Sequence, residues 1–200
     1  LPVSMTLGAL ALSLALISGT LLGVMAALRQ NSGVDYAVMG FGTMGITVPN
    51  FVVAPLLQIF FGLTLAILPL AGWNNGQWKH LILPVITLAL PQIAVIARLT
   101  RASMIEALRS HHIRTLRAQS LDQGTILAHA LRGACLPVVS YLGPAAAALL
   151  TGSVVVETIF TLPGVGRYFV EGALNRDYTL VMGTVVMIAL GRTAEAVAHP

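Results

Sequence analysis

The sequence predicts an all-α fold, namely a polytopic bundle of about five transmembrane helices in which the last span is incomplete. Charged residues make up only 9% of the chain and hydrophobic residues 56%, whereas soluble domains carry about 25% charged residues. Mean hydropathy is +0.86. Two uncharged runs, residues 81–97 and 133–156, flank a basic island at residues 98–132. Because a soluble core would not place such runs on both sides of a basic segment, we expect the island to be the main intracellular loop.

The first half of the chain is expected to cross the membrane twice. Residues 3–28 carry no charge and, at 1.5 Å per residue, exceed the roughly 30 Å apolar thickness of a bilayer. A short polar turn follows. The next uncharged run is too long for one straight helix and contains Pro49, Pro55 and Pro69. We therefore predict one tilted, kinked helix over about residues 35–68, followed by an interfacial loop.

The second half is expected to contain two full spans and one short apolar run. Residues 81–97 form the third span and residues 134–156 the fourth, and a polar loop over residues 157–177 comes next. The last apolar run, residues 178–190, has 13 residues, whereas a span needs about 20. The chain thus divides into a transmembrane domain at residues 1–190, with the island at residues 98–132 inside it, and an atypical polar tail at residues 191–200.

The distribution of basic residues predicts the orientation of the chain. With the island inside, eight positive residues lie on the inner side and three on the outer side, in agreement with the positive-inside rule. Basic and aromatic residues are not interleaved as on a nucleic-acid-binding face, so the net charge of +4 does not indicate a nucleic-acid partner. The inner residues are Arg29, Arg98, Arg101, Arg109, Arg114, Arg117, Arg132 and Arg192, and the outer ones are Lys79, Arg167 and Arg176.

Small residues at helix-packing spacing occur in the first span. Gly19 and Gly23 form a Gly-x-x-x-Gly pattern, which lets two helices approach closely. Glycine is also common in membrane helices that make no such contact. The pattern alone therefore leaves both interpretations open.

The island is predicted to fold as an elbow of two short helices. Residues 110–120 form a helix with a polar, arginine-bearing face, and a break follows at Ser120. Asp122 can cap a second helix over residues 123–131, and the elbow ends at Pro137, where the next span begins. Such an elbow suits docking on a soluble partner. The alternative is a solvated loop whose arginines only set the topology.

Residues 113–137 resemble the cytoplasmic loop, often called the EAA loop, of the permease subunits of ABC importers. The loop looks like that of the B-type membrane subunit of oligopeptide, dipeptide and nickel importers, which carries a pattern close to I-R-T-A-R-A-K-G-L, then H-A-L and L-P. Other similar segments occur in the same order, and the resemblance covers about residues 1–188. The segments are Ile113-Arg-Thr-Leu-Arg-Ala-Gln-Ser-Leu121, His129-Ala-Leu131, Leu136-Pro137, and residues 48–55, 97–106, 156–166 and 172–178.

The resemblance implies a type I ABC importer permease core in the bacterial cytoplasmic (inner) membrane. In that family a short coupling helix in the loop docks in a groove on an ATPase subunit, which hydrolyses ATP and rocks the membrane helices. The resemblance also implies a second permease subunit, an extracytoplasmic solute-binding protein that largely sets selectivity, and no cofactor. The ATPase-docking residues that it implies are Arg114, Leu116, Arg117, Ala118, Gln119, Ser120 and Leu121.

The chemistry of these residues suits such a contact. Ala118 permits close approach, Leu116 and Leu121 can fill an apolar groove, and the arginines can pair with carboxylates at its rim. The chain departs from the family where Ser120 replaces a glycine, which takes positive φ more readily, and where Ala128 replaces a basic residue. It also begins after the family's first helix and ends in an unlike tail, so a fragment, or a truncated or altered product, is expected.

The polar loop after the fourth span is expected on the extracytoplasmic side, where it would help to receive substrate from the binding protein. The loop carries charges of both signs and a tight turn. The alternative is a plain connector, in which the acidic residue at the end of the span has a capping or interfacial position. The candidate residues are Glu157, Pro163, Gly164, Gly166 and Arg167.

The sequence lacks the motifs of an enzyme. No Gly-rich phosphate loop with a following Lys-Ser/Thr, no His-Glu-x-x-His and no Gly-x-Ser-x-Gly occurs. His111 and His112 are adjacent, hence on different helix faces, without further ligands at metal-binding spacing. The absence of an ionisable residue in mid-span disfavours a proton relay. A self-contained secondary carrier or channel and a truncated, non-transporting remnant are the alternatives, and the sequence does not specify the substrate.

Overall fold

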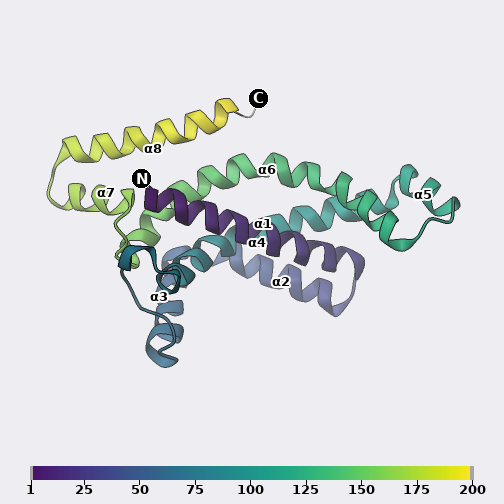
Figure 1. Ribbon diagram of the computed structural model, residues 1–200, viewed down its shortest axis with the longest axis horizontal. Coiled ribbons are helices and arrows are strands. Elements are labelled where there is room, and N and C mark those ends of the chain that lie inside the picture. The colour runs from purple at the N-terminus through teal and green to yellow at the C-terminus, as the bar shows by residue number, and fades with distance from the viewer. Residues whose placement is uncertain (1, 199–200) are drawn as a thin grey trace. The chain divides into compact units, whose positions relative to one another are not determined.

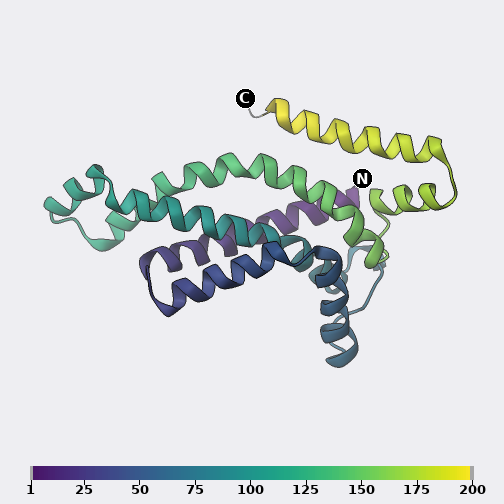
Figure 2. The same ribbon diagram turned by 180° about the vertical axis from the view of Figure 1, so that it is seen from behind.

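The computed structural model describes residues 2–198, which contain helices and no strand. Figures 1 and 2 show the helices in chain order, and the prediction of an all-α fold is confirmed. The elements are α1 (Pro2–Leu28), α2 (Gly33–Thr47), α3 (Asn50–Leu57), the π-helical segment η1 (Gln58–Thr64), the 3₁₀ turn η2 (Asn74–Gly76), α4 (Trp78–Arg109), α5 (His111–Ala118), α6 (Gln123–Ile159), α7 (Val165–Leu174) and α8 (Tyr178–Ala198).

Within residues 2–198, three helices are long and apolar enough to cross a membrane. A fourth crossing results when the two halves of a broken helix, Gly33–Thr47 and Asn50–Thr64, are taken as one span. In α8 the structure describes an apolar stretch over Tyr178–Met187, and the predicted end of the last span at residue 190 lies outside the residues whose side chains are described. The three long helices are Pro2–Leu28, Trp78–Arg109 and Gln123–Leu149.

The second span differs from the single kinked helix predicted over residues 35–68. α2 ends at Thr47, and α3 begins at Asn50 after a sharp bend. Pro49 lies in the break with extended backbone (φ −64°, ψ 145°). Proline has no N–H to donate and moves the preceding residue out of the α region, so the helix is broken rather than kinked.

The third span is longer than predicted. α4 continues past residue 97 to Arg109, so Arg98 and Arg101 lie on a helix rather than in a loop. The physical reason is that Ile96, Thr100 and Met104 are buried at four-residue spacing. This buried stripe extends the packed face of the helix beyond the first arginines, and the loop proper begins only after Arg109.

The fourth span is also longer than predicted. The expected short helix over residues 123–131 and the expected span over residues 134–156 form one helix, α6, which passes through Pro137 without a break. Proline removes one backbone hydrogen bond there, a loss that membrane helices tolerate. Ala134 and Val138, on either side of the proline, are buried, and this packing keeps the helix continuous.

The chain divides into two compact units. Residues 2–13, 48–90 and 143–198 form the first unit, and residues 14–47 and 91–142 form the second. The second unit contains most of α1, all of α2 and α5, and the adjoining halves of α4 and α6. It therefore contains the whole basic island.

Two glycines bring α1 against α4 in the second unit. A Cβ atom at Gly23 would lie 2.6 Å from the backbone oxygen of Ala97 and 2.6 Å from Cβ of Thr100. A Cβ atom at Gly19 would lie 2.9 Å from Cβ of Ile96. Both separations are too short for a real side chain, so of the two interpretations that the pattern leaves open, the structure has the close helix contact.

A buried apolar cluster joins four helices of the second unit. We call it the elbow cluster because it lies where α5 meets α4 and α6. All of its members are at most 5% exposed. They are Ala27 of α1, Met104 of α4, Ile113 of α5, and Ile126, Ala130 and Ala134 of α6.

The predicted polar loop over residues 157–177 contains a helix, α7, which belongs to the first unit. Two side chains accept hydrogen bonds from backbone groups in its first turn. Glu157 Oε2 accepts from Gly166 N–H at 2.8 Å, and Ser4 Oγ accepts from Val165 N–H at 3.2 Å. These contacts satisfy N–H groups that a helix start leaves free, so the segment folds as a helix rather than as a loop.

Candidate functional site

The structure reduces the elbow to residues 110–122, because the predicted second helix is the beginning of α6. From here on, the elbow means α5 and the turn that leads into α6. Ser110 caps the start of α5, because its Oγ accepts a hydrogen bond from Ile113 N–H at 3.4 Å. Ile113 itself is 1% exposed and belongs to the elbow cluster. This buried side chain holds α5 to the other helices, while the polar face of α5 stays outside.

α5 ends in a left-handed turn at Ser120, where φ is +57°. Leu121 N–H donates to the backbone oxygen of Leu116 at 3.4 Å, and Ser120 N–H donates to that of Arg117 at 3.1 Å. These two bonds make up a Schellman C-cap, in which glycine is the preferred residue at the left-handed position. Serine adopts this conformation at a cost of about 1–2 kcal/mol, so the turn keeps its left-handed shape in spite of the departure from the family.

Asp122 caps the start of α6, as predicted. Its Oδ2 accepts from Thr125 N–H at 3.2 Å, and its Oδ1 accepts from the Thr125 hydroxyl at 2.5 Å. These hydrogen bonds hold the pKa of the Asp122 carboxyl below its usual value. The elbow is therefore fixed by a cap at the start of α5, a cap at its end and a cap at the start of α6.

Six of the seven predicted ATPase-docking residues are exposed on the elbow. Leu116 is the exception, because it is half-buried and packs against the elbow cluster. Leu116 thus anchors the elbow, and only Leu121, at 39% exposure, remains as the large apolar side chain that a partner can reach. The exposed residues are Arg114, Arg117, Ala118, Gln119, Ser120 and Leu121.

Two histidines join α5 to α6. The rings of His112 and His129 meet edge to face with their centroids 5.6 Å apart. Together with Glu106 they line a cleft of about 390 Å³ beside the elbow. Over residues 2–198, no group of three or more His, Cys, Asp or Glu side chains is placed to hold a metal ion.

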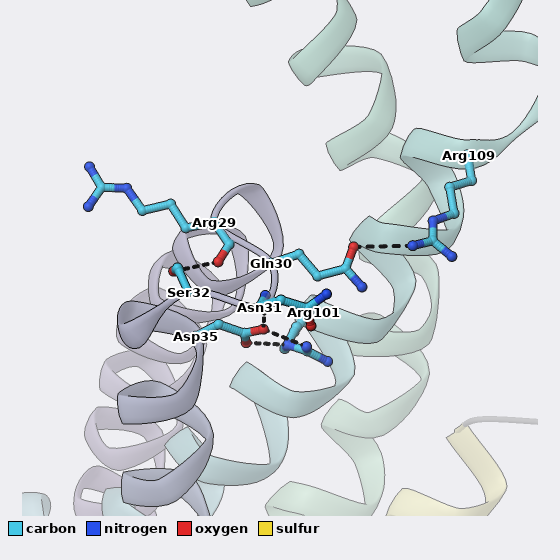
Figure 3. Close-up of polar contacts among 7 residues, drawn as sticks. All are labelled: Arg29, Gln30, Asn31, Ser32, Asp35, Arg101 and Arg109. Carbon is cyan, nitrogen blue, oxygen red and sulfur yellow. Dashed lines mark hydrogen bonds and ion pairs between the residues drawn. The ribbon is translucent and has the colours of Figure 1, made fainter.

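An ion pair joins the first turn of α2 to α4, and we call it the clamp. Arg101 Nε donates to Asp35 Oδ1 at 2.5 Å, and Arg101 Nη2 donates to Asp35 Oδ2 at 2.7 Å (Figure 3). Asn31 N–H donates to Asp35 Oδ2 at 2.9 Å. The side chain of Asp35 is 2% exposed and that of Arg101 25%. Two parallel bonds between a guanidinium and a carboxylate fix direction as well as distance.

Sequence reasoning missed the clamp, because it places Asp35 in a polar turn and Arg101 in a loop. One signal could have found it. Asp35 is the only acidic residue before Glu106. A lone acid between apolar spans is costly unless it has a partner, so a basic residue at the same depth should have been sought.

Three of the predicted extracytoplasmic residues are structural. Glu157 is 0% exposed, and Gly164 and Gly166 are buried as well. A Cβ atom at Gly164 would overlap the carboxylate of Glu157, and one at Gly166 would lie 2.4 Å from Cα of Val154. The glycines therefore let the chain fold closely over the end of α6. The hydrogen bond from Gly166 N–H to Glu157 agrees with a capping position for this residue.

The other two predicted residues lie at the surface. Pro163 and Arg167 are exposed. Arg167 Nε pairs with Glu171 Oε1 at 2.6 Å, one turn further along α7. Both members of this pair are about half exposed, so the pair is accessible to a partner and adds little to stability.

Comparison with known proteins identifies the family. Residues 19–193 match the family described as "Binding-protein-dependent transport system inner membrane component". The chain belongs to this family. It is 54% identical over 188 residues to the oligopeptide transport system permease protein OppB of Salmonella typhimurium and, equally, to OppB of Escherichia coli K12. It is 47% identical over 190 residues to the dipeptide transport system permease protein DppB of Bacillus subtilis.

These matches cover 94% of the chain and 61% of each relative, so the chain spans about three fifths of the length of the relatives. The resemblance to the membrane components of binding-protein-dependent transport systems is confirmed. The family description also confirms the predicted location in the inner membrane, with the several apolar helices of a multi-pass protein. The relatives are named as permease proteins and not as enzymes.

Proposed function

We propose that the chain forms part of the translocation path of an ATP-driven importer and that its elbow docks on a separate ATPase subunit on the cytoplasmic side. The observation that carries this proposal is the elbow itself. It is capped at each helix boundary and anchored by Ile113, yet it presents two arginines and a small residue outward. A loop that only set topology would not need such fixed geometry.

The outward face of the elbow has the composition of a docking surface. Arg114 and Arg117 are three residues apart on α5, so they lie on the same face of the helix and can pair with carboxylates at the rim of a groove. Ala118 and Leu121 provide a small and an apolar side chain beside them. Charged rims around apolar centres are typical of protein interfaces.

The proposed substrate is a peptide or a related small solute. The relatives are named as oligopeptide and dipeptide transport permeases, which supports this class. We further propose that the importer contains a second permease subunit and an extracytoplasmic solute-binding protein. The apolar outer faces of the long helices would contact lipid or the second subunit.

The surface around α7 is the proposed contact for the binding protein. Pro163, just before α7, and Arg167, in its first turn, are exposed, and Arg176 is exposed after its end. With Glu171, these residues offer both signs of charge to a partner. Electrostatic complementarity of this kind mainly accelerates and orients association.

The double variant Arg167→Glu, Arg176→Glu tests this function in the importer reconstituted in vesicles with its ATPase and binding protein. We expect substrate-loaded binding protein to stimulate ATP hydrolysis, and the double variant to need about tenfold more binding protein for half-maximal stimulation, because charge reversal opposes docking. The matched control is Lys79→Glu, which reverses an exposed cation on α4. Stimulation of the double variant with unchanged concentration and salt dependence would show that α7 is a plain connector.

A further inference from the structure

The turn between α1 and α2 and the start of α2 that follows it are each held on α4. The clamp holds the start of α2 at Arg101, and Arg109 Nη2 donates to Oε1 of Gln30, in the turn, at 3.2 Å (Figure 3). The two arginines are eight residues apart, or about 12 Å along the helix axis. Two attachments separated by two turns prevent the turn from rotating about either one. Beside the clamp, Gly23 brings the backbone of α1 against α4.

The elbow is attached to the same pair of helices. Ile113 of α5 is buried with Ala27 of α1 and Met104 of α4 in the elbow cluster. Met104 lies one turn beyond Arg101 on α4. A displacement of α5 therefore moves this end of α4, and the clamp passes the movement to the first turn of α2.

We propose that the clamp is the link that makes α2 follow the elbow, so that Asp35 and Arg101 are positioning residues for coupling between the ATPase and the translocation path. The proposal rests on the proposed function of the elbow. The clamp itself lies in the second unit and outside the elbow. α2 carries the movement to Thr47, where the helix ends at the Pro49 break.

The choice of an ion pair, rather than an apolar contact, supports a positioning role. A buried ion pair is a weak source of stability, and replacing both partners with apolar residues of similar volume is often neutral or stabilising. Removing only one partner leaves an unpaired buried charge, which destabilises. An apolar pair could not form the two parallel hydrogen bonds, which fix the relative direction of the two side chains. It also could not accept the third hydrogen bond, from Asn31 N–H.

This difference gives a test that separates positioning from stability. In the double variant Asp35→Leu, Arg101→Met, no charge is left unpaired. We expect the amount of assembled importer and its melting temperature to stay near those of the parent protein. We expect the amount of a radiolabelled tripeptide transported for each ATP hydrolysed to fall at least fivefold. The matched control is Arg29→Gln, which removes an exposed arginine from the turn between α1 and α2, directed away from the clamp in Figure 3.

A distance measurement tests the linkage directly. Spin labels at Gly40→Cys on α2 and His111→Cys on α5 are placed in a Cys135→Ser background, since Cys135 is the only native cysteine. Both label positions are exposed, and a Cβ atom at Gly40 meets nothing within 4 Å. We expect a narrow distance distribution that a non-hydrolysable ATP analogue leaves unchanged in the parent importer, and a clearly broader one in the double variant.

The outcomes distinguish this inference from the proposed function. A parent distance that changes with nucleotide would overturn the inference, and so would a double variant that keeps both the narrow distribution and normal coupling. If the parent importer showed no ATP-driven transport, the proposed function would fail. In that case the width of the distribution without nucleotide would still decide whether the clamp holds α2 to the elbow.

Discussion

Replacing Arg117 with glutamate is expected to lower transport about tenfold or more while ATP hydrolysis continues. Arg117 is exposed near the end of α5, where the proposed docking surface meets the rim of its groove. A like charge placed opposite rim carboxylates costs several kcal/mol, and each 1.4 kcal/mol corresponds to about a factor of ten in affinity. Substrate uptake and ATP hydrolysis measured in the same vesicles give the ratio that should fall.

Arg29→Glu is the matched control for this variant. It makes the same change of charge at another exposed arginine of the second unit, outside the elbow. Both variants alter the positive-inside balance equally, so topology cannot explain a difference between them. Normal complex formation and normal transport in Arg117→Glu would indicate that the elbow is merely a solvated loop.

Gly23→Ala is expected to lower the free energy of unfolding by about 1–2 kcal/mol. The new methyl group would lie 2.6 Å from both Ala97 O and Thr100 Cβ. The backbone atom cannot move away without shifting α4, and overpacking of this kind costs about 1–3 kcal/mol. The better helix propensity of alanine returns up to about 1 kcal/mol. Unfolding of the purified protein in detergent measures the difference.

Gly40→Ala is the control for helix propensity. A Cβ atom at Gly40 meets nothing within 4 Å, so this change should leave stability unchanged or raise it by up to about 1 kcal/mol. The pair of variants separates close packing from intrinsic propensity. Equal stabilities of Gly23→Ala and Gly40→Ala would contradict the contact between α1 and α4.

The sequence predicts local features correctly where only one local structure suits the residues present. The first span is predicted over residues 3–28 and observed as Pro2–Leu28, because an uncharged run of this length that stops at the polar turn after Leu28 fits one membrane helix. Asp122 is predicted and observed as a cap because its short acidic side chain precedes a helical run. Neither inference requires knowledge of a distant residue.

Proline could not be interpreted from the sequence alone. Pro49 ends a helix and Pro137 does not, although the residue type has the same local effect at both places. Both prolines are exposed, but Ala134 and Val138 beside Pro137 are buried, whereas residues 46–48 before Pro49 are exposed or half-buried. Tertiary packing therefore decides whether the lost hydrogen bond breaks the helix, and the sequence pattern does not contain that information.

Two further features could not be predicted from the sequence: the pairing of residues far apart in the chain, and which side chains of the elbow point inward. Asp35 and Arg101 are 66 residues apart, and no local pattern links them. Leu116 and Leu121 look alike in the loop, yet Leu116 packs inward and Leu121 is exposed. The Schellman turn at Ser120 sets that difference, because it reverses the chain direction between the two leucines.

The measurement that most directly tests docking of the elbow on an ATPase is site-specific photo-cross-linking from Ala118. Ala118 is exposed on the proposed docking surface, and Gly40, exposed on α2, serves as the control position. With a photoreactive amino acid at Ala118, we predict a cross-link to the ATPase subunit whose yield changes when ATP binds, and none from Gly40. No cross-link from Ala118, or equal cross-links from both positions, would contradict the docking of the elbow on an ATPase.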